Sequence, residues 1–272
     1  MTRIICRALA SSAAWLCTLA APPASALVGG TATTEFGQVA RGVQVLPNWV
    51  ITARHLGFAT GASFSNGYGS ATIAQRYDAA TGNFPLDDLA LLRLDTPIAA
   101  PSLSLVADAL MAGGGYAFDA TLTTGLNQAP RGYGFSQVRE FFSMVDPDNG
   151  GPLAPVRANL LVTYTSGYGT PYVQGGDSGG GLFLGHVASL AGGAPLWGIA
   201  SASIADKDAN GNNVNPRSGY VQLANYRSWL DATLATDATD SQALTWVTTA
   251  VPEPATGLLL ALGLGVMAWR RR

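Results

Sequence analysis

Short apolar runs, separated by turn-forming residues, most limit the folds open to this chain. They are rich in β-branched or large apolar side chains, as strands are, and Gly, Asn, Asp or Pro separates them. The 33 Gly and 15 Pro of the 272 residues supply many turns. We therefore predict an all-β fold, a sandwich or barrel, with a hairpin turn at Asn66-Gly67. The runs are "QVARGVQV" (38–45), "WVITA" (49–53), "ATIAQRY" (71–77), "LALLRL" (89–94), "NLLVTYT" (159–165) and "LWGIASASI" (196–204).

One helix is predicted, and it comes late in the chain. Five apolar residues recur there at helical spacing and fall on one face. They are Leu223, Tyr226, Trp229, Leu230 and Leu234.

Composition favours a folded core and argues against a nucleic-acid partner. Apolar residues make up 48% and charged residues 12% of the chain, so disorder is not expected. Residues 27–250 carry 10 Lys and Arg against 16 Asp and Glu, which is a poor match for phosphate groups.

The first 26 residues have the form of a signal peptide. Arg3 and Arg7 precede an apolar run, and Ala24-Ser25-Ala26 ends it in the small-x-small form that signal peptidase cuts. A short buried helix is the alternative. Both cysteines, Cys6 and Cys17, lie in this segment, so the exported chain has to be stabilised by its core rather than by disulfides.

The last residues, "VPEPATGLLLALGLGVMAWRRR" (251–272), form a second targeting segment. The apolar run 255–269 would span about 22 Å as a helix, short of a bilayer core of about 30 Å. The segment resembles the PEP-CTERM sorting tag of Gram-negative bacteria, which implies an exosortase-type partner, transient membrane contact and a place in the cell envelope or outside the cell. A permanent tail anchor is the alternative. The Asp/Thr/Ala-rich stretch 237–250 is predicted to be a linker.

The stretch "VQGGDSGGGLF" (173–183) surrounds Ser178 with glycines. Such a cluster is either a simple turn or the support of a nucleophile, and the choice depends on a base and an acid elsewhere. His55 follows an apolar strand. Asp88 stands at the start of a second apolar strand, where a buried carboxylate needs a hydrogen-bond donor such as a histidine N–H.

The order of these residues separates two kinds of hydrolase. Residues 176–180 fit the Gly-x-Ser-x-Gly elbow of α/β-hydrolases, where the acid and then the histidine follow the serine. The only histidine after Ser178 is His186, which is too close along the chain to fold back as a base. The order His55, Asp88, Ser178 therefore argues against the elbow.

Three stretches together resemble the motifs of chymotrypsin/trypsin-like serine proteases, in that family's order. They are Thr52-Ala53-Arg54-His55, Asp88-Leu89-Ala90-Leu91-Leu92 and Gly176-Asp177-Ser178-Gly179-Gly180. The resemblance extends over residues 27–235 and implies a domain at 27–236. It implies two antiparallel β-barrels that meet near 121–131, the second starting at Gly132-Tyr133-Gly134, and a closing helix at "NYRSWL".

The resemblance also implies roles. Ser178 is the nucleophile, His55 the base and Asp88, rather than Asp87, the orienting acid of an endopeptidase that acts on protein or peptide substrates without a cofactor. The N–H groups of Gly176 and Ser178 form the oxyanion hole. The alternative is a catalytically idle homologue that serves as a cell-envelope or matrix binding protein.

The residues after the expected signal-peptidase cut suggest how such an enzyme is activated. Leu27-Val28-Gly29-Gly30 is similar to the start of the mature family enzymes, which implies that the α-ammonium of Leu27 pairs with Asp177. Signal peptidase itself then makes the activating cut.

Some positions depart from the family pattern. Leu56 replaces a cysteine beside the histidine, and Tyr172 stands where trypsin-like members carry Asp in the specificity pocket. Ser201 matches the serine beneath the acid, but Ala202 and Ser203 replace the usual Trp-Gly. Among the expected substrate-binding residues Tyr172, Ser201 and Ser203, none is acidic, so we expect a small or apolar residue to be preferred, with Tyr172 able to block the pocket.

A possible calcium loop at 206–213 is incomplete. Asp206, Asp208 and Asn210 precede Gly211, but the twelfth position is Arg217 instead of Glu. We expect a polar hairpin loop and no metal.

Overall fold

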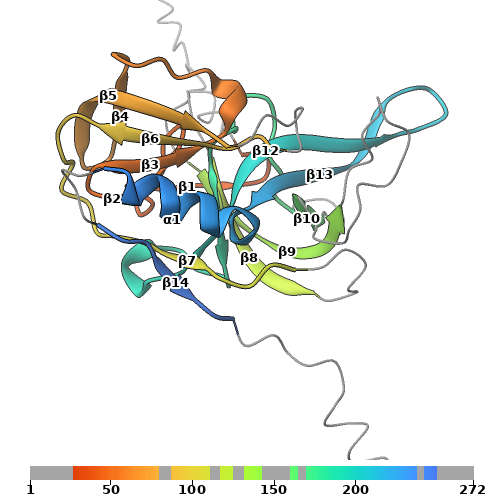
Figure 1. The fold of residues 1–272 in the computed structure, drawn as a ribbon. Coiled ribbons are helices and arrows are strands. Elements are labelled where there is room, and N and C mark those ends of the chain that lie inside the picture. The colour runs from red at the N-terminus through yellow and green to blue at the C-terminus, as the bar shows by residue number, and fades with distance from the viewer. Residues whose placement is uncertain are drawn as a thin grey trace, which may run out of the picture.

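The computed structural model describes residues 27–79, 87–110, 117–124, 132–142, 160–164, 170–237 and 242–249. It is mostly β-strand, with one short helix, α1 (Arg227–Ala235), near the end of the domain (Figure 1). The predicted all-β class is confirmed. The expected signal peptide and sorting segment lie outside the described residues. None of the helices in the described ranges is long and apolar enough to cross a membrane.

The first sheet has five antiparallel strands in the order β2-β3-β6-β5-β4. The apolar runs predicted as strands around residues 50, 75 and 92 all fall in it. All four residues of β3 are buried: Trp49 and Ile51 pack between the two sheets, and Val50 packs inside this one. The strands are β2 (Val43–Leu46), β3 (Trp49–Thr52), β4 (Ser63–Asn66), β5 (Gly69–Asp78) and β6 (Ala90–Leu94).

Side chains, rather than a strand ladder, join the two edges of this sheet. Gln44 of β2 and Asn66 of β4 lie on opposite edges, yet Asn66 Nδ2 donates to Gln44 Oε1 over 2.6 Å. Gln44 is fully buried, and its Nε2 also donates to the carbonyls of Ile98 (2.8 Å) and Pro47 (3.0 Å). The sheet is therefore curled into a half-barrel, and the buried amides of Gln44 and Asn66 form a seam between its two edges.

The second sheet closes on itself. Six of its strands form the ring β11-β8-β9-β10-β13-β12, because β11 pairs with both β8 and β12. Its short members β1, β7 and β14 attach to this ring. The strands are β1 (Thr31–Ala32), β7 (Ser104–Val106), β8 (Phe118–Thr123), β9 (Gly132–Phe142), β10 (Leu160–Tyr164), β11 (Gly181–Leu184), β12 (Leu196–Lys207), β13 (Asn213–Gln222) and β14 (Thr245–Val247).

Three hydrophobic clusters correspond to this arrangement. One lies inside the first sheet, one draws side chains from all six ring strands of the second, and the third lies between the sheets. Because successive side chains of a strand point to opposite faces, one strand can contribute to two clusters. On β10, Leu161 faces the ring interior, while Leu160 and Val162 face the first sheet. The turn η3 (Leu223–Tyr226) and α1 cover the third cluster with Leu223, Leu230 and Leu234.

Two boundaries differ from those expected. Strands β7 and β8 both belong to the second sheet, so this sheet begins before residues 121–131, where the barrels were expected to meet and most of which lie outside the described residues. In the stretch expected to be a linker, residues 245–247 form β14 and pair with β7. This pairing joins segments about 140 residues apart, so local sequence patterns could not predict it.

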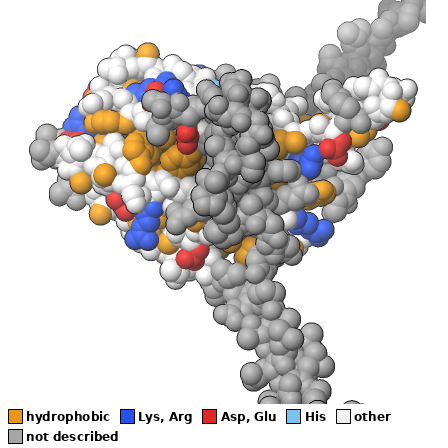
Figure 2. All heavy atoms as spheres, turned by 45° about the vertical axis from the view of Figure 1, so that its right-hand side comes forward, with side chains coloured by type: hydrophobic (Ala, Val, Ile, Leu, Met, Phe, Trp, Pro, Cys, Tyr) orange, Lys and Arg blue, Asp and Glu red, His pale blue; other side chains and the backbone are white. Residues whose placement is uncertain are grey.

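Charged side chains are dispersed over the face shown in Figure 2. On the part of this face that is not drawn in grey, Lys and Arg and Asp and Glu are both present and scattered.

We expect the seam of the first sheet to contribute measurably to stability. Gln44→Ala removes three hydrogen bonds and leaves buried carbonyls and an amide unpaired, so the free energy of unfolding should fall by about 2–4 kcal/mol. Gln75→Ala, at an exposed position of β5 in the same sheet, should cost below about 0.5 kcal/mol. Urea unfolding of both variants tests this; equal losses would contradict a structural seam.

Candidate active site

His55 and Asp88 meet at the edge of the first sheet. His55 lies in the turn η1 (Arg54–Leu56), which directly follows β3, and Asp88 precedes β6, the neighbour of β3. The imidazole Nδ1 is 2.7 Å from Asp88 Oδ2, and the backbone N–H of His55 donates to Asp88 Oδ1 over 2.8 Å. Asp88 is only 2% exposed, whereas a third of the His55 side chain is open to solvent. The acid is thus buried beneath a histidine that solvent can reach.

The second barrel supplies a further donor to this acid. The Ser201 hydroxyl, on β12, donates to Asp88 Oδ2. Ionised carboxylates are costly to bury unless several donors surround them. Here the donors come from both barrels, so Asp88 ties the barrels together as well as holding His55.

Ser178 lies in a tight glycine-rich turn before β11. The turn is closed by Asp177 N–H to the Gln174 carbonyl (3.0 Å) and by Gly180 N–H to the Asp177 carbonyl (3.1 Å). Gly176 and Gly179 have φ of +102° and +85°, which favour glycine. The segment is therefore a shaped backbone element rather than a flexible link.

Gly179 brings this turn against the first barrel. Its N–H donates to the Ala200 carbonyl on β12 (2.9 Å), and a Cβ on it would lie 2.5 Å from the Arg41 carbonyl oxygen and 3.0 Å from Leu56 Cδ1. Leu56 directly follows His55, so the turn that contains Ser178 and the turn that contains His55 are in contact. Within the described residues the Ser178 hydroxyl makes no hydrogen bond to His55. Catalytic hydrogen bonds are often long before substrate binds.

Two amides in this turn remain unpaired. Neither the N–H of Gly176 nor that of Ser178 forms a hydrogen bond within the described part of the chain. Gly176 is exposed and Ser178 is half-buried, so an oxygen atom that approaches from outside can reach these amides.

Asp177 is buried beneath the turn with one oxygen unsatisfied. Its Oδ2 accepts the Gln174 N–H over 2.9 Å, while Oδ1 is buried without a partner. Burial raises the pKa of Asp177 to about 7, and the Gln174 N–H partly opposes that shift. Burial, and secondarily the nearby Asp177, also raises the pKa of Tyr220, whose hydroxyl has no partner either.

The start of the domain reaches the same region. Leu27 is fully buried in the cluster that contains Val173 and Tyr220. Val28 and Tyr172 exchange two backbone hydrogen bonds of 3.2 Å. The structure therefore brings Leu27 into the core that also contains the unpaired Tyr220 hydroxyl.

A pocket of about 210 Å³ opens beside Ser178. Among the described residues, Ser201 and Ser203 line it and Tyr172 does not. The backbone of Tyr172 pairs with that of Val28. A larger cavity of about 510 Å³ shares no lining residue with this pocket. The remaining lining residues of the smaller pocket are Val173, Gln174, Gly175, Ser178, Ala200 and Ala202.

Asp87 has a partner that its position in the sequence did not reveal. The hydroxyl of Tyr226, on η3, donates to Asp87 Oδ1 over 2.8 Å. Burial, and then this hydrogen bond to Asp87, raises the pKa of Tyr226. The two neighbouring acids thus face different groups: Asp88 faces His55, and Asp87 faces the closing helical segment.

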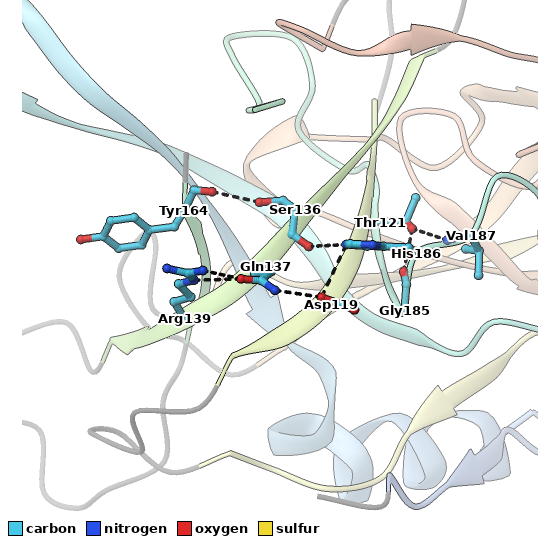
Figure 3. A network of polar contacts seen from close by, with 9 residues as sticks. All are labelled: Asp119, Thr121, Ser136, Gln137, Arg139, Tyr164, Gly185, His186 and Val187. Atoms are coloured by element: carbon cyan, nitrogen blue, oxygen red, sulfur yellow. Dashed lines mark hydrogen bonds and ion pairs between the residues drawn. The ribbon is translucent and has the colours of Figure 1, made fainter. Parts of the chain in front are cut away.

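The second histidine belongs to a separate structural network (Figure 3). His186 Nε2 lies 3.1 Å from the Ser136 carbonyl and 3.7 Å from Asp119 Oδ1, and its ring stacks on Phe135. Thr121 fixes the turn around it by donating to the Gly185 carbonyl and accepting the Val187 N–H. His186 is therefore engaged outside the pocket of Ser178.

The acidic side chains of the loop at 206–213 bond to groups in the loop and on the adjoining strand β13. Asp208 accepts the N–H groups of Asn210 and Asn212 and the side-chain amide of Asn212, and this last bond is the main reason why its pKa is lowered. Asp206 pairs with Arg217 over 2.6 Å. Among the described residues no group of three or more His, Cys, Asp or Glu is placed to hold a metal ion.

Comparison with known proteins identifies the end of the chain. A model described as the PEP-CTERM protein-sorting motif matches residues 250–272, so the resemblance noted in the sequence is confirmed. This motif indicates export, association with the cell envelope of a Gram-negative bacterium, and recognition by an exosortase-type sorting enzyme. No curated protein sequence matches the chain.

Solved structures identify the fold. Human heparin binding protein is 16% identical, with a TM-score of 0.50 over 79% of this chain and 99% of that one. A structure titled "Atomic resolution structure of HBP" gives 0.49 at the same identity and coverage. At this identity the likeness concerns the fold alone, and that fold is trypsin-like, as predicted.

The contact at Gly179 can be tested with a matched pair of glycines. Gly179→Ala meets the Arg41 carbonyl, whereas Gly185 has nearly the same φ (+86°) and open space around it. We expect Gly185→Ala to lower the free energy of unfolding by about 1 kcal/mol and Gly179→Ala by roughly 3 kcal/mol or more. Denaturant unfolding measures both. Similar losses would show that φ alone, and not the contact between the barrels, demands glycine at 179.

Proposed function

We propose that the chain is an exported serine endopeptidase. The observation that carries this proposal is the contact of His55 with buried Asp88 beside a glycine-shaped turn in which Ser178 and two unpaired amides lie together. This combination supplies a base, an orienting acid, a nucleophile and donors for a developing oxyanion.

Proton transfer follows from the hydrogen bonds of the imidazole. With Nδ1 donating to Asp88, the lone pair of the neutral ring is on Nε2, which can take the hydroxyl proton of Ser178. The Ser178 oxygen then bonds to the scissile carbonyl carbon. Asp88 stays ionised and stabilises the imidazolium, assisted by Ser201 and by the backbone N–H of His55.

The developing negative charge is stabilised by the turn itself. When the carbonyl carbon becomes tetrahedral, its oxygen accepts from the amides of Gly176 and Ser178. The imidazolium passes its proton to the departing amine, leaving an ester on Ser178. Water attacks this ester with His55 again as base, which releases the acid product and restores the serine.

The pocket beside Ser178 supports a preference for small or apolar side chains. Val173, Ala200 and Ala202 give it apolar walls, while Ser201 and Ser203 give it neutral polar groups. Among the described residues its lining contains no acid to pair with a substrate Lys or Arg.

A binding protein without catalytic activity is the second candidate. The observation in its favour is that the likeness in fold extends to a protein named for binding heparin. The two candidates differ in one property: only the enzyme has a Ser178 that reacts with substrate.

Covalent labelling of Ser178 tests the proposal. A fluorophosphonate should label the processed protein at Ser178, and Ser178→Ala and His55→Ala should each lower kcat/KM for peptide substrates by about 10⁶-fold. Asp88→Asn should lower it by about 10⁴-fold, because the amide favours the wrong tautomer of His55.

The matched control for Asp88 is its neighbour. Asp87→Asn retains an acceptor for the Tyr226 hydroxyl and should keep activity within a few-fold of the parent. If processed, folded protein is not labelled, the endopeptidase is refuted. If the two aspartates exchange their effects, the assignment of the acid is wrong.

Activation by signal peptidase is the regulatory part of the proposal. A cut after Ala26 frees the α-ammonium of Leu27, and the buried, unpaired Oδ1 of Asp177 is an acceptor for such a cation. Because Asp177 lies between Gly176 and Ser178, this pairing would fix the two amides of the oxyanion hole.

Stability against pH distinguishes paired from unpaired Asp177. When residues precede Leu27, the folded chain holds a proton on Asp177 up to about pH 7, whereas the unfolded chain releases it near 3.8. The folded state then binds more protons, so stability should fall by about 2–4 kcal/mol as pH rises from 4 to 7. The chain that starts at Leu27 should lack this loss, because the ammonium lowers the pKa of Asp177.

Urea unfolding at pH 4.5 and 7.5 measures both forms. Asp177→Asn in the extended chain is the control and should remove the pH dependence. An identical pH dependence of the extended and mature chains, or full peptidase activity of the extended chain, would rule out the pairing.

A further inference from the structure

The segment before the sorting motif is docked on the folded domain. Strand β14 runs parallel to β7, with Thr245, Trp246 and Val247 opposite Ser104, Leu105 and Val106. The N–H of Ala107 donates to the Val247 carbonyl over 2.8 Å. β7 also pairs with β12 of the closed barrel, so β14 is an outer strand of the same sheet (Figure 1).

Side chains from α1 and the core hold this strand in place. Leu244 is 8% exposed and belongs to the cluster between the barrels. Trp246 Nε1 donates to Asp231 Oδ1 on α1 over 2.9 Å, and the guanidinium of Arg227 lies 5.3 Å from the Trp246 ring centroid. The strand is therefore held through its side chains as well as its backbone.

A carboxylate fixes the last residue before the motif. Asp108, two residues beyond β7, accepts the Thr249 N–H over 2.6 Å and the Thr249 hydroxyl over 3.2 Å, both at Oδ2. Hydrogen bonds to an ionised carboxylate are stronger than those between neutral groups. The sorting motif begins at residue 250, directly after this anchor.

We propose that residues 242–249 form a docking strand that controls access of the exosortase-type enzyme to the sorting motif. A protease binds its substrate chain in extended form on both sides of the bond it cuts, and a backbone group that is paired in a sheet is not available to a second partner. The Thr249 N–H and the Val247 carbonyl are paired in this way. Local opening of β14 therefore precedes sorting.

The length of chain after the anchor supports the proposal. Only residues 250–254 separate Thr249 from the apolar run that begins at Ala255. Five residues of any chain reach at most about 18 Å. A membrane-bound enzyme that grips the motif therefore meets the folded domain at once, unless β14 has been released. This inference does not depend on the peptidase activity.

The test follows removal of the motif from the full-length chain in its native host, by pulse-chase and mass spectrometry. All variants carry Ser178→Ala, so that the chain cannot process itself. Asp108→Ala frees Thr249 and Asp231→Ala frees Trp246; each should increase the rate of processing about five- to tenfold. Asp119→Ala, on β8 and away from this strand, is the matched control and should leave the rate unchanged.

Hydrogen exchange at the Thr249 amide in purified, unprocessed protein shows whether the strand has been released. Faster exchange together with faster processing in both Asp108→Ala and Asp231→Ala supports a docking strand that controls sorting. Unchanged or slower processing in variants whose Thr249 amide exchanges faster overturns it. A native chain from which the motif is never removed overturns it too.

Discussion

The buried carboxylate of Asp88 is the interaction on which the arrangement of this molecule depends. Its donors are the backbone and ring of His55, from the first barrel, and the Ser201 hydroxyl, from the second. A carboxylate that is 2% exposed is costly unless all of these donors stay in place. Any relative movement of the barrels would expose the Asp88 carboxylate or remove its hydrogen-bond donors. Asp88 therefore stabilises the interface at which the candidate site lies.

The turn that contains Ser178 depends on the same interface. Gly179 fits against the Arg41 carbonyl of the first barrel while its N–H is held by Ala200 of the second. Beneath the turn, Asp177 and Tyr220 have polar atoms that the fold leaves unsatisfied. Buried polar groups without partners are rare and usually have a functional reason. Here the unsatisfied atoms of Asp177 and Tyr220 lie in the region where the proposed activation step would place the α-ammonium of Leu27.

Local apolar runs located six of the strands, whereas the proposed catalytic residues came from the resemblance of three motifs to a known family. The runs around Val50, Leu92 and Ile199 became β3, β6 and β12, because burial on both faces requires continuous apolar sequence. Long-range contacts were not accessible in this way. The Tyr226–Asp87 bond joins residues 139 apart, and β14 lies in a polar-rich stretch whose pairing depends on β7. The pairing of Tyr172 with Val28, at the start of the domain, is another long-range contact of this kind.

The edges of the two sheets are joined by different means, and this difference has a consequence for heat inactivation. The second sheet closes through a continuous ladder, whereas the edges of the first are linked by the side-chain amides of Gln44 and Asn66. Because few hydrogen bonds join those edges, we expect the first sheet to open at lower free energy than the second. His55 and Asp88 lie on the first sheet and Ser178 on the second. The proposed site would then come apart before the molecule as a whole unfolds, so the first sheet would limit its resistance to heat.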